Sequence, residues 1–169
     1  MSNNQHQQKH QVKVLCTGGT IDKIYFDALS EFQIGDPVVN NILKEALAKF
    51  SFEVESILKK DSLEITDDDR EMIFKHVTAE PCENILITHG TDTMINTAQR
   101  LEEIKDKTIV LTGAMQPARF RNTDAIFNIG YSIAAAQHLP HGIYLAMNGQ
   151  IFTPDAVQKN RAAAQFEAT

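Results

Sequence analysis

The stretch over residues 85–104 joins a short strand to a helix, and it constrains the fold more than any other part of the sequence. Ile85-Leu86-Ile87-Thr88 is a short apolar run rich in β-branched residues, which favours a strand. It ends abruptly in His89-Gly90-Thr91-Asp92-Thr93, and helical spacing follows from Met94 to Ile104. Such a junction is typical of open α/β sheets, in which ligands bind at the carboxyl ends of the strands.

The rest of the chain repeats this alternation of strands and helices. Strands are predicted at residues 12–16, 53–58, 85–88, 107–112 and 143–147, with a short return strand at 150–153 after the Asn148-Gly149 turn. Helices are predicted at about 36–50, 66–77, 94–104 and 123–137. We therefore expect an α/β fold with three α/β/α layers and a mostly parallel, flavodoxin-like sheet.

Three segments carry no clear periodicity. Residues 1–11 are polar and are predicted to form a disordered tail, which leaves 12–169 as a single domain. Residues 21–34 form a stretch long enough to be a lid or a binding loop. Residues 155–169 hold Lys159 and Arg161 before an alanine-rich end, and no element is assigned there.

Composition excludes several classes of protein. The net charge is −6 at pH 7, which argues against a surface for nucleic acid or anionic membranes. Two cysteines, Cys16 and Cys82, are too few for a disulfide framework and are predicted to be buried thiols. No apolar run approaches the ~20 residues of a membrane helix, and the N-terminal segment lacks the apolar core of a secretory signal. We therefore expect a cytoplasmic protein that does not bind membranes.

Hydroxyl groups follow three of the predicted strands. Thr17 and Thr20 follow the first strand, Ser62 the second, and Thr91 with Thr93 the third. Because the carboxyl ends of parallel strands meet at one edge of a sheet, these hydroxyls should lie within reach of one another. A hydroxyl is a poor nucleophile until a base removes its proton.

The candidate activators lie on different segments. Tyr25 and Lys159 both lie outside the central helices, and Asp92 would hold the lysine beside Thr91. His89 is open to two interpretations: it acts as a base on a hydroxyl, or it packs at the strand end and bonds to backbone. Thr91 and Asp92 have a simpler alternative role as caps of the following helix.

Other familiar chemistries lack their motifs. The sequence contains no Gly-x-Ser-x-Gly elbow, no complete Gly-x-Gly-x-x-Gly fingerprint and no P-loop. His, Asp and Cys residues are too few at the strand ends for a zinc or two-metal hydrolase, and His138 and His141 are predicted to lie at the surface. We expect neither a metal nor a cofactor.

Five segments, in order and at workable spacing, together resemble the bacterial-type L-asparaginase family. They cover residues 12 to about 161 and are Thr17-Gly18-Gly19-Thr20-Ile21, Asp61-Ser62, Ile87-Thr88-His89-Gly90-Thr91-Asp92-Thr93-Met94, Gly113-Ala114-Met115-Gln116-Pro117, and Met147-Asn148 with Lys159-Asn160. The fourth has glutamine where the family has arginine, and Leu63 stands where a glutamine often follows the serine.

The resemblance implies a catalytic role for five residues. Thr20 would be the nucleophile, activated by Tyr25. Thr91, Lys159 and Asp92 would form a second hydroxyl relay.

The resemblance also implies how the substrate is held. Ser62 and Asp92 would hold its α-carboxylate and α-amino groups. The backbone N–H of Thr91, with Ala114 close by, would lie near the developing oxyanion. Gly19, Asp61 and Gly90 belong to the same substrate-binding segments.

The implied activity is hydrolysis of L-asparagine to L-aspartate and ammonia through an acyl-threonine intermediate. Three alternatives stay open: hydrolysis of glutamine or a related small amide, an inactive module that binds aspartate or asparagine, and a fragment of a two-domain enzyme. The family's usual C-terminal domain is absent from this sequence, although a compact subclass without it is active. Family members assemble as dimers of tight dimers, so a homodimer or homotetramer is expected.

Overall fold

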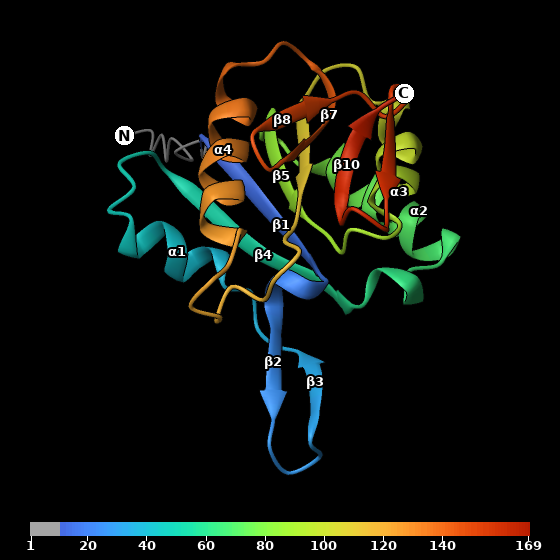
Figure 1. Ribbon diagram of the computed structural model, residues 1–169. Helices are drawn as coiled ribbons and strands as arrows, with labels where there is room; N and C mark the ends of the chain where they lie inside the picture. Colours follow the sequence, from blue (N-terminus) through green and yellow to red (C-terminus); the bar gives the residue numbers. More distant parts are fainter. Residues whose placement is uncertain (1–10) are drawn as a thin grey trace, which may run out of the picture.

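The computed structural model describes residues 11–169 and is built around one mixed sheet (Figure 1). Its six strands lie in the order β4-β1-β5-β6-β7-β8. Neighbours are parallel except for β8, which is antiparallel to β7. Their bounds are β1 Val12–Gly18, β4 Phe52–Lys60, β5 Asn84–Thr88, β6 Thr108–Thr112, β7 Gly142–Met147 and β8 Gln150–Phe152. Residues 1–10 of the expected N-terminal tail lie outside the described residues.

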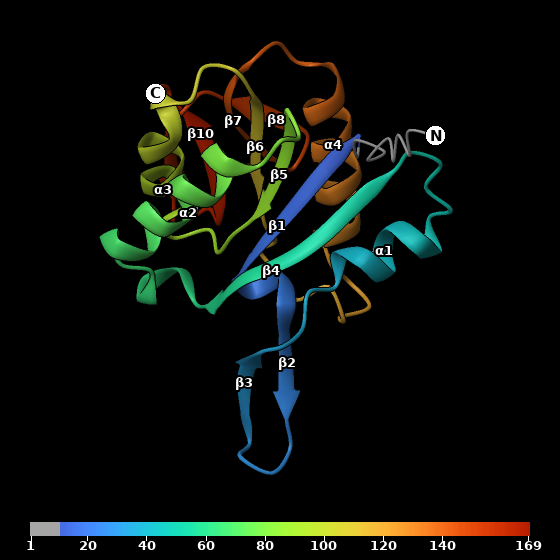
Figure 2. The ribbon, with the colours of Figure 1, turned by 180° about the vertical axis from the view of Figure 1, so that it is seen from behind.

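Helices cover both faces of this sheet, which confirms the predicted three-layer α/β/α fold. One core joins the sheet to α1 (Val39–Glu45) and α4 (Ala125–His138). The other joins it to α2 (Asp67–Ala79) and α3 (Met94–Arg100). Figures 1 and 2 show α4 on one side of the sheet and α2 with α3 on the other. When the five parallel strands are numbered by their order in the chain, their order across the sheet is 2-1-3-4-5, which is the flavodoxin-like order.

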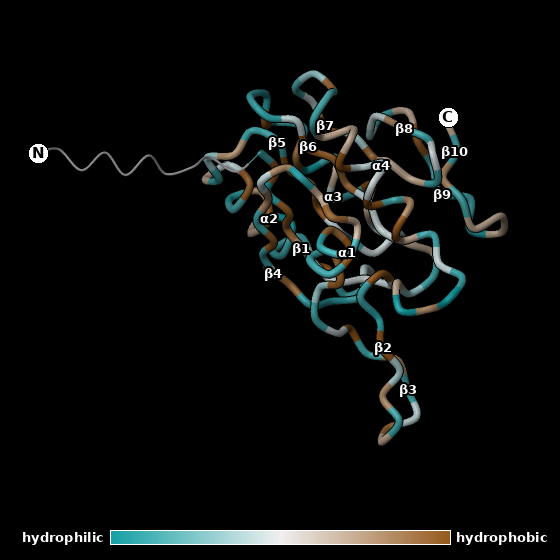
Figure 3. The backbone as a smooth tube through the Cα atoms, turned by 90° about the vertical axis from the view of Figure 1, so that its left-hand side faces the viewer, coloured by the Kyte–Doolittle hydropathy of each residue, from teal (hydrophilic) through white to brown (hydrophobic). Residues whose placement is uncertain are grey.

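The central strands are apolar because the helical layers bury both of their faces. All of β1 and β6 is buried, and hydrophobic segments run through the middle of the molecule (Figure 3). Lys13 is the one charged residue of β1, and its ammonium group lies within 3.0 Å of carboxylates from both Glu53 and Glu55. Burial opposes its charge, but these two hydrogen-bonded carboxylates raise the pKa of Lys13 overall.

The sheet has its topological switch point between β1 and β5. From β1 the chain crosses to β4 on one side, and it then returns past β1 to form β5 on the other. Ligands of such sheets bind in the crevice outside the carboxyl ends of the two strands at this point. Here those ends carry Gly19-Thr20 and Gly90-Thr91, so the fold places two of the predicted site segments side by side.

Two β-hairpins were not predicted. β2 (Lys23–Phe26) and β3 (Glu31–Ile34) occupy the stretch expected to be a loop, and this hairpin projects from the body (Figures 1 and 2). β9 (Val157–Asn160) and β10 (Gln165–Ala168) form the second hairpin near the C-terminal end. Its Val157 and Phe166 join the core on the α2 and α3 face.

The first helix is shorter than predicted. It begins at Val39 rather than near Asp36, because Asp36 forms an ion pair with Lys59 and leaves the helix start without a side-chain cap. It ends at Glu45, two residues before Leu47, whose positive φ of 53° takes the backbone out of the helix. The predicted extension to about residue 50 is therefore wrong.

Candidate active site

Three strand ends meet in close backbone contact at the switch point. Gly19 has φ +90°, and a Cβ on it would lie 2.5 Å from the Cα of Gly90. A Cβ on Gly90 would in turn lie 2.6 Å from the Cβ of Ser62. The two glycines therefore let the segments after β1, β5 and β4 touch, and Thr20, Ser62 and Thr91 are brought to one place.

Lys159 forms the centre of a polar cluster at this edge. Its ammonium group donates to the Thr91 hydroxyl at 2.8 Å and to Asp92 Oδ1 at 2.7 Å. These contacts join β9 to the end of β5 across 67 residues of sequence. Arg161 lies farther off, 3.8 Å from the same carboxylate oxygen. We call Thr91, Asp92 and Lys159 the lysine cluster.

The segment that follows β5 also holds Ser62 in place. The buried Ser62 hydroxyl accepts from the backbone N–H of Asp92 at 3.2 Å, and its carbonyl accepts from the Thr93 hydroxyl at 2.7 Å. Thr93 is the N-cap of α3 and makes no side-chain cap bond. Since the side chains of Thr91 and Asp92 both accept from Lys159, the capping-only interpretation of these two residues is wrong.

Thr20 begins a 3-10 turn, Thr20–Asp22, directly after Gly19 and is partly exposed. The other hydroxyl after β1, Thr17, is fully buried and donates to the Thr88 carbonyl at 2.8 Å. Thr17 therefore joins two strands, whereas Thr20 is partly accessible to solvent.

His89 is not a base for these hydroxyls. Its Nδ1 lies 2.7 Å from the Gly90 carbonyl, which can only accept, so Nδ1 carries the proton. Nε2 then accepts from the buried Thr97 hydroxyl at 2.8 Å. Burial lowers the pKa of His89 to about 4, so the ring is neutral near pH 7. The packed, backbone-bonded interpretation of His89 is the correct one.

Tyr25 lies on the projecting hairpin, whereas Asp61 contacts the hairpin at its base. Tyr25 is on β2, is 53% exposed and packs edge-on against Phe32 with ring centroids 5.4 Å apart. Among the described residues no hydrogen bond joins Tyr25 to Thr20. Asp61 pairs with Lys23 at 2.8 Å and caps the 3-10 turn Ser62–Glu64. The Lys23–Asp61 ion pair therefore ties the hairpin to the Ser62 segment, a link that no sequence pattern indicated.

The family comparison agrees with this geometry. A family model described as the N-terminal part of asparaginase matches residues 11–168, which is nearly the whole chain. The chain belongs to the asparaginase family. The resemblance drawn from the five segments is thereby confirmed.

Similar asparaginase-family proteins are known by sequence and structure. A probable periplasmic L-asparaginase from Haemophilus influenzae is 28% identical over 165 residues, which cover 90% of this chain and 47% of that protein. A glutaminase-asparaginase from Acinetobacter glutaminasificans is 30% identical over 173 residues, which cover 89% and 50%. The thermostable L-asparaginase from Thermococcus kodakarensis has a TM-score of 0.80 at 29% identity, covering 93% and 50%. The chain thus spans about half the length of the curated relatives it matches.

The asparaginase-family segment after β6 is anchored by residues that were not predicted to support the site. Ala114 is buried in this segment, which follows Thr112. Asp124 is the N-cap residue of α4, but it makes no side-chain cap bond and accepts from the backbone of Met115 and Gln116 instead. The spacing of Asp124 and Asn128 at the start of a helix was the available signal.

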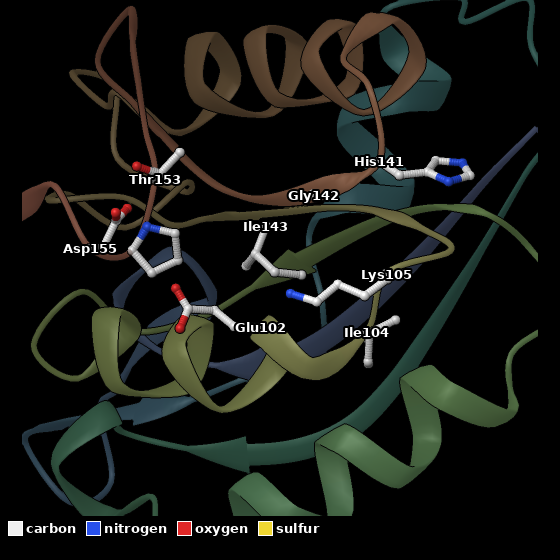
Figure 4. A pocket seen from close by; sticks show the side chains of 9 residues that line it. Glu102, Ile104, Lys105, His141, Gly142, Ile143, Thr153 and Asp155 are labelled. Carbon is white, nitrogen blue, oxygen red and sulfur yellow. The ribbon is translucent and has the colours of Figure 1, made fainter.

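A cavity of about 540 Å³ lies at the other edge of the sheet, near the amino end of β7. Figure 4 shows Glu102 and Lys105 directing charged groups toward it, with Thr153 and Asp155 on its far side. It contains no member of the lysine cluster, so it is separate from the candidate site.

Within residues 11–169, no group of three or more His, Cys, Asp or Glu side chains is arranged to hold a metal. No helix in that range is long and apolar enough to cross a bilayer.

Proposed function

We propose that this protein is an amidohydrolase that converts L-asparagine to L-aspartate and ammonia. The observation that carries the proposal is the lysine cluster, in which one ammonium group contacts both the Thr91 hydroxyl and the Asp92 carboxylate. A lysine placed against a hydroxyl can relay a proton, and the adjacent carboxylate fixes its position. Membership of the asparaginase family supports the same reaction.

The reaction divides into two steps through an ester. The Thr20 oxygen attacks the amide carbon, a C–O bond forms, and the C–N bond breaks as the nitrogen leaves with the threonine proton as ammonia. Water then adds to the ester carbon, and its hydrolysis releases L-aspartate and regenerates the Thr20 hydroxyl. The lysine cluster forms a proton relay separate from the activation of Thr20. In this relay the Thr91 hydroxyl passes protons between Lys159 and the reacting groups.

The supporting roles follow the family pattern. Ser62 and Asp92 hold the α-carboxylate and α-amino groups of the substrate, and Ser62 is already bonded to the Asp92 backbone. The Thr91 N–H and Ala114 face the developing oxyanion. Gly19, Asp61 and Gly90 belong to the segments around the substrate, and the two glycines allow the close approach described above.

Tyr25 is proposed as the activator of Thr20. The exposed position of Tyr25 on the hairpin means that this role requires β2 and β3 to bring its hydroxyl closer to Thr20 when substrate binds. The hairpin is joined to the body at its base by the Lys23–Asp61 ion pair and by a hydrogen bond from Gly35 to Asp22. These anchors leave the distal part of the hairpin as the part that moves.

A glutaminase activity is the second candidate for the same site. The relative from Acinetobacter glutaminasificans carries the name glutaminase-asparaginase, and this supports testing both amides. Leu63, which is 67% exposed beside Ser62, offers no hydrogen bond to a substrate. We expect asparagine to be the faster substrate, because the shorter amide places its carbonyl one methylene closer to the Ser62 and Asp92 anchors.

The test is an ammonia-release assay on purified protein with asparagine and glutamine. Lys159→Met should lower kcat on asparagine at least ~100-fold, because a general acid–base residue typically contributes that much or more. Lys105→Met is the matched control, since Lys105 is exposed at the separate cavity, and it should keep the wild-type rate. Ammonia release at the wild-type rate by Lys159→Met would remove the lysine cluster from the mechanism.

We also propose that the protein forms homodimers or homotetramers and works in the cytoplasm. The exposed face of α4 carries Ile126 and Phe127, which are 57% and 59% exposed, and this supports association between copies. Cys16 and Cys82 are both buried, as predicted, and neither forms a disulfide among the described residues, which is usual in the cytoplasm. Light scattering measures the first property, and fractionation of cells followed by immunoblotting measures the second.

A further inference from the structure

Asp124 lies outside the five family segments and is the centre of a hydrogen-bond network. Its carboxylate accepts from the backbone N–H of Met115 at 3.0 Å and from that of Gln116 at 3.1 Å. It also accepts from the side-chain amides of Asn128 at 3.0 Å and Asn148 at 3.1 Å. Four donor groups therefore converge on one side chain at the carboxyl edge of the sheet.

Asn128 extends the network to the other side of Ala114. Its amide donates to the Gly113 carbonyl at 2.9 Å, and its side-chain oxygen accepts from the Asn148 backbone at 3.0 Å. Ala114 is 1% exposed and lies between Gly113 and Met115, both of which are tied to this pair of side chains. The position of its backbone is therefore set by Asp124 and Asn128.

The same segment contacts both parts of the candidate site. A Cβ on Gly113 would lie 2.3 Å from the His89 carbonyl, so the segment packs closely against the residue before Gly90. Farther along, the Ala118 N–H donates to the Ile21 carbonyl at 3.1 Å, within the turn that begins at Thr20. A displacement of this segment would therefore also displace both the turn that begins at Thr20 and the end of β5.

We propose that Asp124 is a positioning residue that holds the segment Gly113–Gln116 where the reaction needs it. The proposal rests on the amidohydrolase function proposed above. A carboxylate suits the task because it only accepts, and all four of its partners donate. Since Asp124 makes no side-chain cap bond to α4, its carboxylate serves this segment rather than the helix start.

Asp124→Asn tests the proposal, because an asparagine of the same shape would point an NH₂ group at donors of the network. We expect kcat on asparagine to fall ~10- to 100-fold, since small misplacements of reacting groups cost this much. KM should change less than kcat, because Ser62 and Asp92 remain in place. Asp106→Asn, at an exposed position before β6, is the matched control and should keep the wild-type kcat.

Hydrogen exchange provides a readout that does not depend on turnover. In Asp124→Asn the amides of Met115 and Gln116 should exchange faster, while those of the central strands keep their protection. An unchanged kcat, or unchanged exchange at both amides, would overturn the proposal. If the wild-type protein releases no ammonia, the proposed function fails, and the exchange result alone then decides whether Asp124 positions the segment.

A second variant covers the case in which Asp124→Asn does not fold. Asn148→Gly removes one donor from the outer side of the network and suits the positive φ of 51° at this position. It should lower kcat several-fold and speed exchange at Met115 and Gln116. Wild-type values for both measurements in this variant would overturn the proposal.

Discussion

Gly19 and Gly130 differ in what surrounds their Cα atoms. A Cβ on Gly19 would meet the Gly90 backbone at 2.5 Å, and the residue has φ +90°, whereas nothing lies within 4 Å of a Cβ on Gly130 in α4. One glycine is therefore required for the contact between strand ends. The other only lowers the helix propensity of α4.

These two positions predict opposite effects of the same substitution. Gly19→Ala should lower the free energy of unfolding by more than ~1 kcal/mol, because the side chain meets backbone and the backbone conformation is strained. Gly130→Ala should raise it by about 0.5–1 kcal/mol, which is the helix preference of alanine over glycine. Urea unfolding of both variants measures the two changes, and wild-type stability in Gly19→Ala would refute the close-contact account.

Single residues of the site differ in how far sequence could predict them. The Thr91 and Asp92 pair stands out because it follows a clear strand. Lys159 stands out less, because it belongs to a hairpin 67 residues away. Its position outside the predicted helices made it a candidate partner of Asp92, and the resemblance to a family supported that pairing. Asp124 is hard to predict as a support of the site, because an aspartate at a helix start usually serves as a cap.

Among the elements, the projecting hairpin depends on Asp22 at its base. The Asp22 carboxylate accepts from the Val38 N–H at 3.0 Å, and its carbonyl accepts from the Gly35 N–H at 2.8 Å. Both contacts connect residues that follow the hairpin, Gly35 and Val38, to Asp22, which precedes it. Burial raises the pKa of Asp22 to about 6, although the hydrogen bond from Val38 favours the charged form.

This buried carboxyl predicts a pH dependence of stability. Because its pKa is raised from 3.8 to about 6, the folded state binds more protons than the unfolded state between those values. The contribution of Asp22 to stability is therefore fully present below pH 3.8 and is lost as pH rises through about 6.

Asp22→Asn removes this titration. The stability of the variant relative to wild type should be higher at pH 7 than at about pH 4, by at most about 3 kcal/mol. Urea unfolding at the two pH values measures the difference, and Asp27→Asn at the exposed turn of the hairpin controls for the loss of one carboxylate. A difference of the opposite sign would contradict the assignment.

Elements with buried faces were predicted, and the exposed hairpins were not. β1, β5, β6 and β7 are apolar runs because helices cover them on both faces, and such runs are visible in sequence. β2 and β3 are mostly exposed, so no burial imposes an alternation of apolar residues on them. In β9 and β10 the short strands around an alanine-rich turn carry too few buried residues to show a period.

At the scale of the whole molecule, the strand order explains why residues far apart in sequence meet. The switch point brings the end of β1 beside the end of β5, and the β9–β10 hairpin then places Lys159 against that edge. The alternation of strands and helices predicted the parallel sheet, and hence one edge for the hydroxyls. The contact between Lys159 and Thr91 depends on the second hairpin, which the pattern did not predict.

The central claim is that Thr20 and Thr91 at this edge both take part in amide hydrolysis. The most direct measurement is ammonia release from L-asparagine by wild type, Thr20→Ala, Thr91→Ala and the control Thr153→Ala, which alters an exposed threonine at the separate cavity. We predict the wild-type rate for the control and a loss of at least ~100-fold for the other two, with circular dichroism unchanged. Wild-type rates in Thr20→Ala and Thr91→Ala, or no ammonia from the wild-type protein, would contradict the account.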